Sequence, residues 1–484
     1  MSIKDLQPTI VWNNFYGLTR VPRPSKHEGK VQEYLLQWGK DHGVEVRRDE
    51  TGNIIFTAPA TPGFENRRGV ILQGHMDMVP QKTGDSTHDF LKDPINAYVD
   101  GEWVTADRTT LGADNGMGLA LAMAVLESKD VKHGPIEVLA TYDEETGMTG
   151  AECLKPGVLK GDILINIDSE EEGELCVGCA GGLDATATFA YRKAATPEGY
   201  VAYSLTVKGL QGGHSGMDIS LYRANANKAV ARILLPLMEK RGVKLVSFNG
   251  GSLRNAIPFE AEAVILVPSA GSRAVKAAVE EEFAKIKFEF KESDPSAEMV
   301  YAKVATPAKY VGDKVALRVI KSLLACPSNV IRMSRTMEGL TETSINMAIV
   351  RTNPGTIIVH SLMRSAVDSA KAALADRVRS VFELAGAKVS FAGGYSGWTP
   401  KLDTPMNKVM MEQFEKVYGK PMKIMATHGG LECALLGAKY PHWEMVSIGP
   451  TIKYPHSPDE RVNIASVART WEYLKAVLEA VPVK

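Results

Sequence analysis

The sequence has 484 residues, too many for one ordinary hydrophobic core, so we expect two or three domains. Hydrophobic residues make up 44%, charged residues 23%, and the formal net charge is −1, which is typical of a soluble globular protein. This balance has no basic or acidic excess that would favour a nucleic acid or a membrane surface as partner.

The start of the chain has no signal-type apolar core, and no run of about 18 apolar residues follows it. The 5 cysteines are too few for a disulfide framework. We therefore expect a protein of the reducing cytoplasm.

The first third of the chain alternates between strand-like and helix-like segments. We expect helices at 10–18, 28–43, 116–128 and from about Thr149, and strands at 44–48, 53–57, 70–72, 136–140 and 162–167. This alternation predicts an α/β fold, a mostly parallel sheet flanked by helices. In such sheets the ligand site lies beyond the carboxyl ends of the strands.

The middle of the chain has a different pattern, which predicts an inserted α+β domain. There we expect strands at 203–208 and 261–267 and helices at 223–239, 273–287 and 314–324. After this domain we expect helices at 406–418, 431–436 and 464–478 and a strand at 444–448. Glycine-rich segments near 179–182 and 393–398 are the expected crossing points. We therefore predict a catalytic domain formed by 1–181 and 392–484, interrupted by a lid domain at 182–391.

The first candidate site residues are His75 and Asp77, directly after the apolar run of the strand at 70–72. Residues two apart on a strand point to the same side, so both side chains can face one site. This suits a metal-binding imidazole whose other nitrogen is held by a carboxylate. Taken alone, the pair is read more simply as a structural histidine with a hydrogen-bond partner.

Other acidic and imidazole groups share the same expected location, just past the strand ends or in nearby loops. They are Asp114, Glu144, Glu145, Asp168 and His456. Carboxylates packed together without a counter-charge repel one another and are costly to desolvate, and metal ions are the simplest remedy. Two histidines with several carboxylates match the ligand preferences of zinc, and also those of manganese or cobalt.

Two ions bridged by one carboxylate would place Asp114 in the middle. His75 and Asp168 would then bind one ion, and Glu145 and His456 the other. Glu144 would stay free to take a proton from the bridging water. Taken alone, Glu144 and Glu145 are more often a solvated helix start, and the acidic run at 169–174 is read as mostly surface.

Six segments together resemble a known family: GHMDMVP, TTLGADNGMG, DEETGMTGA, NIDSEEEGE, GGHSG and PHSPDE. They are similar to the co-catalytic zinc exopeptidases related to carboxypeptidase G2 and aminoacylase-1. Within this family the likeness, which runs almost end to end, is closest to the dipeptidases that cleave Xaa-His peptides.

The resemblance implies roles for individual residues. It gives His75, Asp114, Glu145, Asp168 and His456 as metal ligands. It also implies that Asp77 orients His75, that Glu144 is the general base and acid, and that a non-proline cis peptide follows Asp114.

The resemblance also assigns residues of the lid domain. His214 is implied to steady the oxyanion of the tetrahedral intermediate, and Asn255 and Arg364 to hold the substrate. His428 and Glu432 lie where relatives have a loop that lines the site, although a helix-capping role is an equal alternative.

The expected function is a dinuclear metal-dependent dipeptidase that hydrolyses Xaa-His and related short peptides through a metal-bridging water deprotonated by Glu144. The same metal centre would also suit a tripeptidase or an N-acyl amino acid deacylase. A binding protein that kept the fold and lost activity would lack Glu144 or a ligand, and here each position is filled. Smaller relatives dimerise through their lids. The sequence therefore leaves open whether this chain forms a homodimer and whether His214 acts in its own subunit or in the partner.

Overall fold

The computed structural model describes residues 2–484, and the chain forms two compact units. The first unit consists of Met1–Gly178, Trp398–Ala426 and Leu431–Lys484. The second consists of Cys179–Gly397 and Thr427–Gly430. No helix among the described residues is long and apolar enough to cross a membrane.

The first unit is built on an eight-stranded sheet in the order β1-β2-β6-β3-β7-β23-β8-β22. The strands are β1 (Glu45–Arg48), β2 (Ile54–Ala58), β3 (Val70–His75), β6 (Ile136–Thr141), β7 (Ile163–Asn166), β8 (Glu174–Cys179), β22 (Lys423–Thr427) and β23 (Glu444–Ser447). At its centre β6, β3, β7 and β23 run parallel, as predicted. β1 pairs with β2, β2 with β6 and β8 with β23 in antiparallel fashion. The short turn between β1 and β2 can connect only antiparallel neighbours.

Helices cover both faces of this sheet, which confirms the α/β prediction. They are α1 (Thr9–Thr19), α2 (Gly29–Asp41), α3 (Ala113–Glu127), α4 (Glu144–Gly147), α5 (Thr149–Cys153), α10 (Pro405–Tyr418), α11 (Glu432–Lys439) and α12 (Ile464–Ala480). Val70 and Leu72 of β3 pack in the core shared with α1, α3 and α12, while Ile71 between them is equally buried on the opposite face. A strand buried on both faces reads as a continuous apolar run, which is how it stands in the sequence.

A small four-stranded sheet in the first unit was not predicted. It consists of β4 (Ala97–Asp100), β5 (Trp103–Ala106), β24 (Ile452–Lys453) and β25 (Arg461–Asn463), in the order β24-β25-β5-β4. These strands have two to four residues each, too few to show a period in the sequence. The sheet matters for function because His456 lies in the loop between β24 and β25.

The second unit contains a nine-stranded sheet whose recorded strand pairs are all antiparallel. Its members are β9 (Gly181–Ala190), β11 (Tyr200–Lys208), β13 (Lys244–Gly250), β15 (Ala261–Pro268), β16 (Glu298–Val304), β18 (Asn329–Met333), β19 (Thr341–Asn353), β20 (Thr356–Ser365) and β21 (Lys388–Ala392). The strands β10 (Lys193–Ala195) and β17 (Lys309–Val311) form a separate pair, as do β12 (Gly213–His214) and β14 (Ala256–Ile257).

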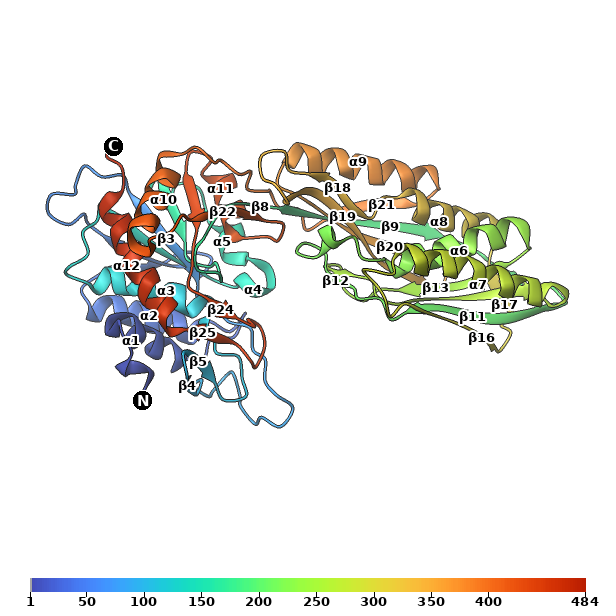
Figure 1. Cartoon of the computed structure of the whole chain (residues 1–484), viewed down its shortest axis with the longest axis horizontal. Coiled ribbons are helices and arrows are strands. Elements are labelled where there is room, and N and C mark those ends of the chain that lie inside the picture. Colours follow the sequence, from blue (N-terminus) through green and yellow to red (C-terminus); the bar gives the residue numbers. More distant parts are fainter. Residues whose placement is uncertain (1) are drawn as a thin grey trace. The chain divides into compact units, whose positions relative to one another are not determined.

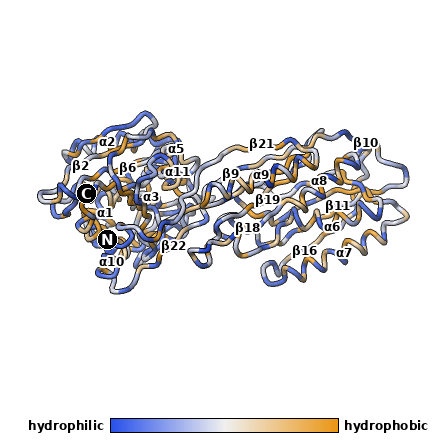
Figure 2. Tube along the Cα trace, turned by 90° about the horizontal axis from the view of Figure 1, so that it is seen from above, coloured by the Kyte–Doolittle hydropathy of each residue, from blue (hydrophilic) through white to orange (hydrophobic). Residues whose placement is uncertain are grey.

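The helices of the second unit lie on one face of this sheet (Figure 1), which confirms its α+β character. They are α6 (Ala226–Lys240), α7 (Ser272–Glu289), α8 (Asp313–Ala325) and α9 (Asp368–Leu384). Hydrophobic and hydrophilic residues alternate along them (Figure 2), and the apolar ones join a common core with the sheet. α6 begins later than predicted because the Asn225 side chain accepts the backbone N–H of Lys228 and caps the helix.

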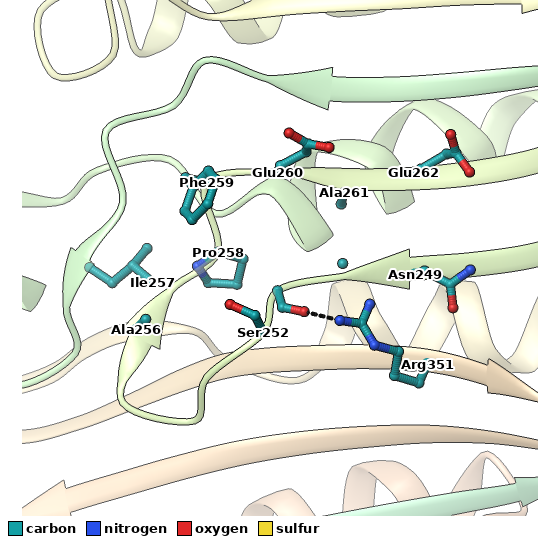
Figure 3. Close-up of a pocket in the computed structure, with 12 residues that line it drawn as sticks. Asn249, Ser252, Ala256, Ile257, Pro258, Phe259, Glu260, Ala261, Glu262 and Arg351 are labelled. Atoms are coloured by element: carbon teal, nitrogen blue, oxygen red, sulfur yellow. Dashed lines mark hydrogen bonds between the residues drawn. The ribbon is translucent and has the colours of Figure 1, made fainter. Parts of the chain in front are cut away.

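The second unit also contains a pocket of about 420 Å³, lined by residues of β13, β14 and the loop between them (Figure 3). Phe259, Pro258 and Glu260 line it, and Arg351 donates to the backbone carbonyl of Gly251 at its edge. None of the predicted site residues lines this pocket.

Candidate metal centre and substrate-binding residues

His75 is the last residue of β3, which lies between β6 and β7 with both neighbours parallel. The carboxyl ends of the three strands therefore meet at one edge of the sheet, as the sequence argument required. The ring of His75 is 1% exposed, and its Nδ1 lies 3.2 Å from Oδ1 of the fully buried Asp77. This contact fixes the orientation of the imidazole and leaves Nε2 facing the site.

Asp114 lies between two imidazoles. Its Oδ1 is 3.0 Å from Nε2 of His75, and its Oδ2 is 3.1 Å from Nε2 of His456. It is the second residue of α3, and the Asp114–Asn115 peptide bond is cis, as the resemblance implied. Burial raises the pKa of Asp114, but hydrogen bonds from both imidazoles outweigh it and the net pKa is lowered.

Each imidazole also lies next to a second carboxylate. Asp168, just past the end of β7, places Oδ1 3.5 Å from Nε2 of His75. Glu145 places Oε2 3.0 Å from Nε2 of His456. The structure therefore brings together all five of the predicted ligands within the first unit.

Glu144 and Glu145 form the start of the short helix α4. Their backbone N–H groups donate to the two oxygens of Asp77, at 3.1 and 3.3 Å. Burial raises the pKa of Glu144, His75 lowers it, and Asp168 and the other nearby carboxylates raise it further, with a net rise. A carboxylate with a raised pKa holds a proton more readily, which general acid–base chemistry at neutral pH requires.

The residues fit a metal ion. Donor atoms of His75, Asp114 and Glu145 all lie within 4.8 Å of one another and could hold one. Among the described residues, Oε1 of Glu145 and Oδ1 of Asp168 are buried without a hydrogen-bond partner. Hydrogen bonds to Asp114 and Glu145 raise the pKa of His456 to about 11, so a positive charge is favoured where its Nε2–H lies. A divalent cation supplies that charge and the partners that the orphaned oxygens lack.

Among the buried acidic groups close to the cluster, Glu28 and Asp143 were not assigned from the sequence. Glu28, Asp77 and Asp143 form a second group of carboxylates, and burial raises the pKa of Glu28 to about 7. Glu432 is fully buried at the start of α11 and accepts hydrogen bonds from Thr141 and Gln73. An isolated glutamate within the apolar segment LECALL is the one local signal for its burial.

In the second unit, the ring of His214 has a defined tautomer. Its Nδ1 accepts the backbone N–H groups of Gly216 and Met217, at 3.3 and 3.1 Å, so the proton lies on Nε2. Burial and the nearby positive charge of Arg364 lower its pKa. His214 is therefore a neutral imidazole with Nε2–H available as a donor.

Arg364 on β20 is 7% exposed, and its Nη1 donates to the hydroxyl of Tyr395 at 3.4 Å. Its Nε is buried without a partner, and no carboxylate within residues 2–484 forms an ion pair with it. A buried guanidinium left in this state is poised for an anionic ligand. Asn255 is exposed on the loop before β14, where its backbone carbonyl accepts the N–H of Ser215 at 2.7 Å.

His428 is also in the second unit and is 5% exposed. Its Nε2 forms a hydrogen bond with the hydroxyl of Ser344 at 2.7 Å. Burial and the charge of Arg364 lower the pKa of His428 to about 3, so it is neutral at physiological pH.

The α/β fold with this imidazole–carboxylate cluster defines the class of metal-dependent hydrolases. The model of peptidase family M20/M25/M40 matches residues 71–480. The chain therefore belongs to this family, and it is a metal-dependent peptidase that acts on a peptide substrate.

Individual relatives agree with this assignment. The cytosol non-specific dipeptidase of Escherichia coli is 44% identical over 482 residues, covering 100% of this chain and 99% of that protein. The crystal structure of aminoacylhistidine dipeptidase from Vibrio alginolyticus is 47% identical with a TM-score of 0.93, covering 100% of this chain and 99% of that one. The aminopeptidase PepT of Bacillus cereus, at 17% identity and a TM-score of 0.58 over 98% of this chain and 99% of its own, shares the fold.

Proposed function

We propose that this peptidase is a dinuclear metal-dependent dipeptidase that cleaves Xaa-His and related short peptides. The observation that carries the proposal is the carboxylate of Asp114, which lies 3.0 Å from one imidazole and 3.1 Å from the other. The names of the E. coli and Vibrio relatives support a dipeptide substrate. The name of the Vibrio relative supports histidine as the C-terminal residue, whose amine leaves.

We assign two ions to the first unit, with Asp114 between them. His75 and Asp168 would hold one ion, and Glu145 and His456 the other. Zinc is the metal we expect, because imidazole and carboxylate ligands suit it, and manganese and cobalt accept the same donors. Asp77 is assigned to orient His75.

When bound, the ions supply the positive charge that lowers the pKa of water and polarises the substrate carbonyl. Glu144 takes the proton of the attacking water and hands it to the leaving amine, and its raised pKa suits both transfers. The fully buried Glu432 is among the carboxylates that raise the pKa of Glu144.

The second unit supplies substrate contacts in this proposal, with residues 182–391 as the lid domain. The Nε2–H of His214 donates to the oxyanion that forms on the attacked carbonyl. The unpaired guanidinium of Arg364 binds the C-terminal carboxylate of the substrate, and Asn255 adds an amide contact. The name of the E. coli relative supports a cytoplasmic location.

The substrate is tested with metal-stripped protein refilled with zinc, manganese or cobalt. The panel holds Gly-His, β-Ala-His, Gly-Leu, a tripeptide and an N-acetyl amino acid. Preferential cleavage of the Xaa-His members supports the proposal. Cleavage of the tripeptide or of the acyl amino acid alone makes the chain a tripeptidase or a deacylase with the same metal centre.

Glu144→Gln tests the mechanism. The amide keeps the shape of the side chain but cannot take a proton, so kcat should fall roughly 100- to 10,000-fold with metal content unchanged. Glu50→Gln, at an exposed glutamate paired with Lys155, is the matched control and should keep full activity. Near-normal turnover of Glu144→Gln with metals bound contradicts the assignment.

A further inference from the structure

Residues 111–114, which lead into α3 and include its first two residues, form the loop called here the loop before α3. A carboxylate from the far end of the chain holds this loop. Oε2 of Glu460 accepts the backbone N–H groups of Leu111 and Gly112, at 2.8 and 2.9 Å. Oε1 accepts those of Ala113 and Asp114, at 2.7 and 3.1 Å. Backbone N–H groups at a helix start lack partners within the helix, and the N-cap residue Gly112 offers no side chain. Glu460 takes over the capping of this helix.

Glu460 belongs to the same turn as His456. Its own N–H donates to the carbonyl of Ser457 at 3.1 Å, and its carbonyl accepts the hydroxyl of Thr105 on β5 at 2.8 Å. The side chain is 1% exposed, so water does not compete for these bonds. One residue therefore connects the turn that carries His456 to the loop that carries Asp114.

Arg23 fixes the same loop from the opposite side. Its guanidinium is 2% exposed and donates to the carbonyls of Met76 and Asp77, at 3.2 and 2.8 Å, and to that of Gly112. Gly112 has a φ of +72°, and a Cβ at this position would lie 2.6 Å from Nη2 of Arg23. Glycine is therefore required at position 112. The loop is thus held between a buried guanidinium and a buried carboxyl group.

We propose that Glu460 is a positioning residue of the metal centre, which sets the place of Asp114 relative to His456. Without it, four adjacent N–H groups lose their acceptor and the loop shifts until they find others. Displacement of Asp114 would move the carboxylate that we propose as a ligand of both ions. The inference rests on the proposed function, since it concerns the affinity of that centre for metal.

The test is metal affinity, measured by competition with a chromophoric chelator on Glu460→Gln. The amide keeps one acceptor oxygen and turns an NH₂ group toward two N–H donors. We expect the apparent Kd of at least one ion to rise about 10- to 100-fold, the range found for residues that orient ligands. The absorption spectrum of the cobalt-filled protein should change as well, because the ligand geometry changes.

Glu137→Gln is the matched control. Glu137 is 8% exposed in the same unit and accepts the backbone N–H groups of Lys160 and Gly161, at 2.7 and 2.9 Å, ahead of β7 rather than beyond its carboxyl end. Glu137→Gln can keep both bonds, because Lys160 and Gly161 donate to the same oxygen, and it shows the effect of losing a buried carboxylate elsewhere in the unit. Only Glu460→Gln should lose metal. Equal metal affinity in the two variants and the wild type overturns the inference.

Two further measurements keep the result interpretable. If Glu460→Gln does not fold, Glu460→Asp keeps the charge but shortens the reach, and the same rise in Kd is expected; unchanged affinity overturns the inference. If the wild type itself binds no divalent metal, the proposed function fails. If the wild type binds metal and the variants bind it equally well, only the positioning role fails.

Discussion

The carboxylate of Asp77 accepts the backbone N–H of Glu144 at 3.1 Å, and the same oxygen lies 3.2 Å from Nδ1 of His75. A single buried residue thus contacts both the strand end that carries a proposed ligand and the helix start that carries the proposed base. Because its other oxygen accepts the N–H of Glu145, both residues of that helix start depend on one anchor.

Asp77→Asn should therefore affect metal binding and turnover together. The amide keeps the size of the side chain. In either of its two orientations, however, the NH₂ group faces an N–H donor, that of His75 in one and that of Glu145 in the other. We expect a loss of about 10- to 100-fold in metal affinity or activity. Asp130→Asn, at an exposed position of the same unit, is the control. Unchanged metal content with unchanged kcat would remove Asp77 from the site.

His214→Ala should lower kcat roughly 100- to 1000-fold, because it removes the Nε2–H donor proposed for the oxyanion. Metal content should stay at the wild-type level, since His214 belongs to the second unit and is not a proposed ligand. His360→Ala, another partly buried histidine of that unit, should keep its activity. Loss of metal from His214→Ala would argue against this role.

Mixing His214→Ala with Glu144→Gln tests where His214 acts. If the protein is a homodimer in which the lid histidine serves the partner, mixed dimers contain one intact site and activity returns. If His214 serves its own chain, the mixture stays inactive. Sedimentation of the wild type reports whether a dimer forms at all.

Arg364→Met should lower kcat/KM for dipeptides by about 10- to 100-fold, the range for loss of hydrogen bonds to a charged group. A dipeptide amide lacks the carboxylate, so wild type should cleave it poorly and the variant should cleave both forms at similar low rates. Arg379→Met, at an exposed arginine on α9, is the control. A variant that still prefers the free carboxylate would exclude this contact.

His428 should make the second unit sensitive to acid. Burial lowers its pKa to about 3, below the ordinary value of 6.5, so the unfolded chain binds a proton that the folded chain excludes. Stability should therefore fall as pH drops from about 6.5 toward 3, by roughly 2 kcal/mol at pH 5. His428→Gln keeps a polar side chain that can form a hydrogen bond with Ser344, and it does not titrate.

Urea unfolding of wild type and His428→Gln at pH 7 and pH 5 measures this difference. The variant should lose less stability than the wild type between the two pH values, whatever its stability at pH 7. His27→Gln, at an exposed histidine, should retain the pH dependence of the wild type. Parallel losses in wild type and His428→Gln would show that another group carries the acid sensitivity.

Much of the secondary structure could be predicted because it is local. α3 was expected at 116–128 and spans Ala113–Glu127, and β3 begins at the predicted Val70. The whole sheet β4-β5-β24-β25 was missed, since its strands are too short to show a period and join segments far apart in the chain. α9 and the long strands β19 and β20 were also not predicted.

The sequence alone determined the α/β class and, through its ordered motifs, the peptidase family and the set of residues that form the cluster. It could do so because strand ends and chemical residue types are properties of short segments. Only the tertiary structure decided the distances around Asp114, the tautomer of His214 and the unpaired state of Arg364. It also revealed Glu460 and Arg23 on either side of the loop before α3. The contacts of Glu460 depend on groups brought together from distant parts of the chain, such as Asp114 and Glu460, which are 346 positions apart, and no local pattern records them. The tautomer of His214 depends on the direction of two nearby backbone N–H groups, which the residue types alone do not record.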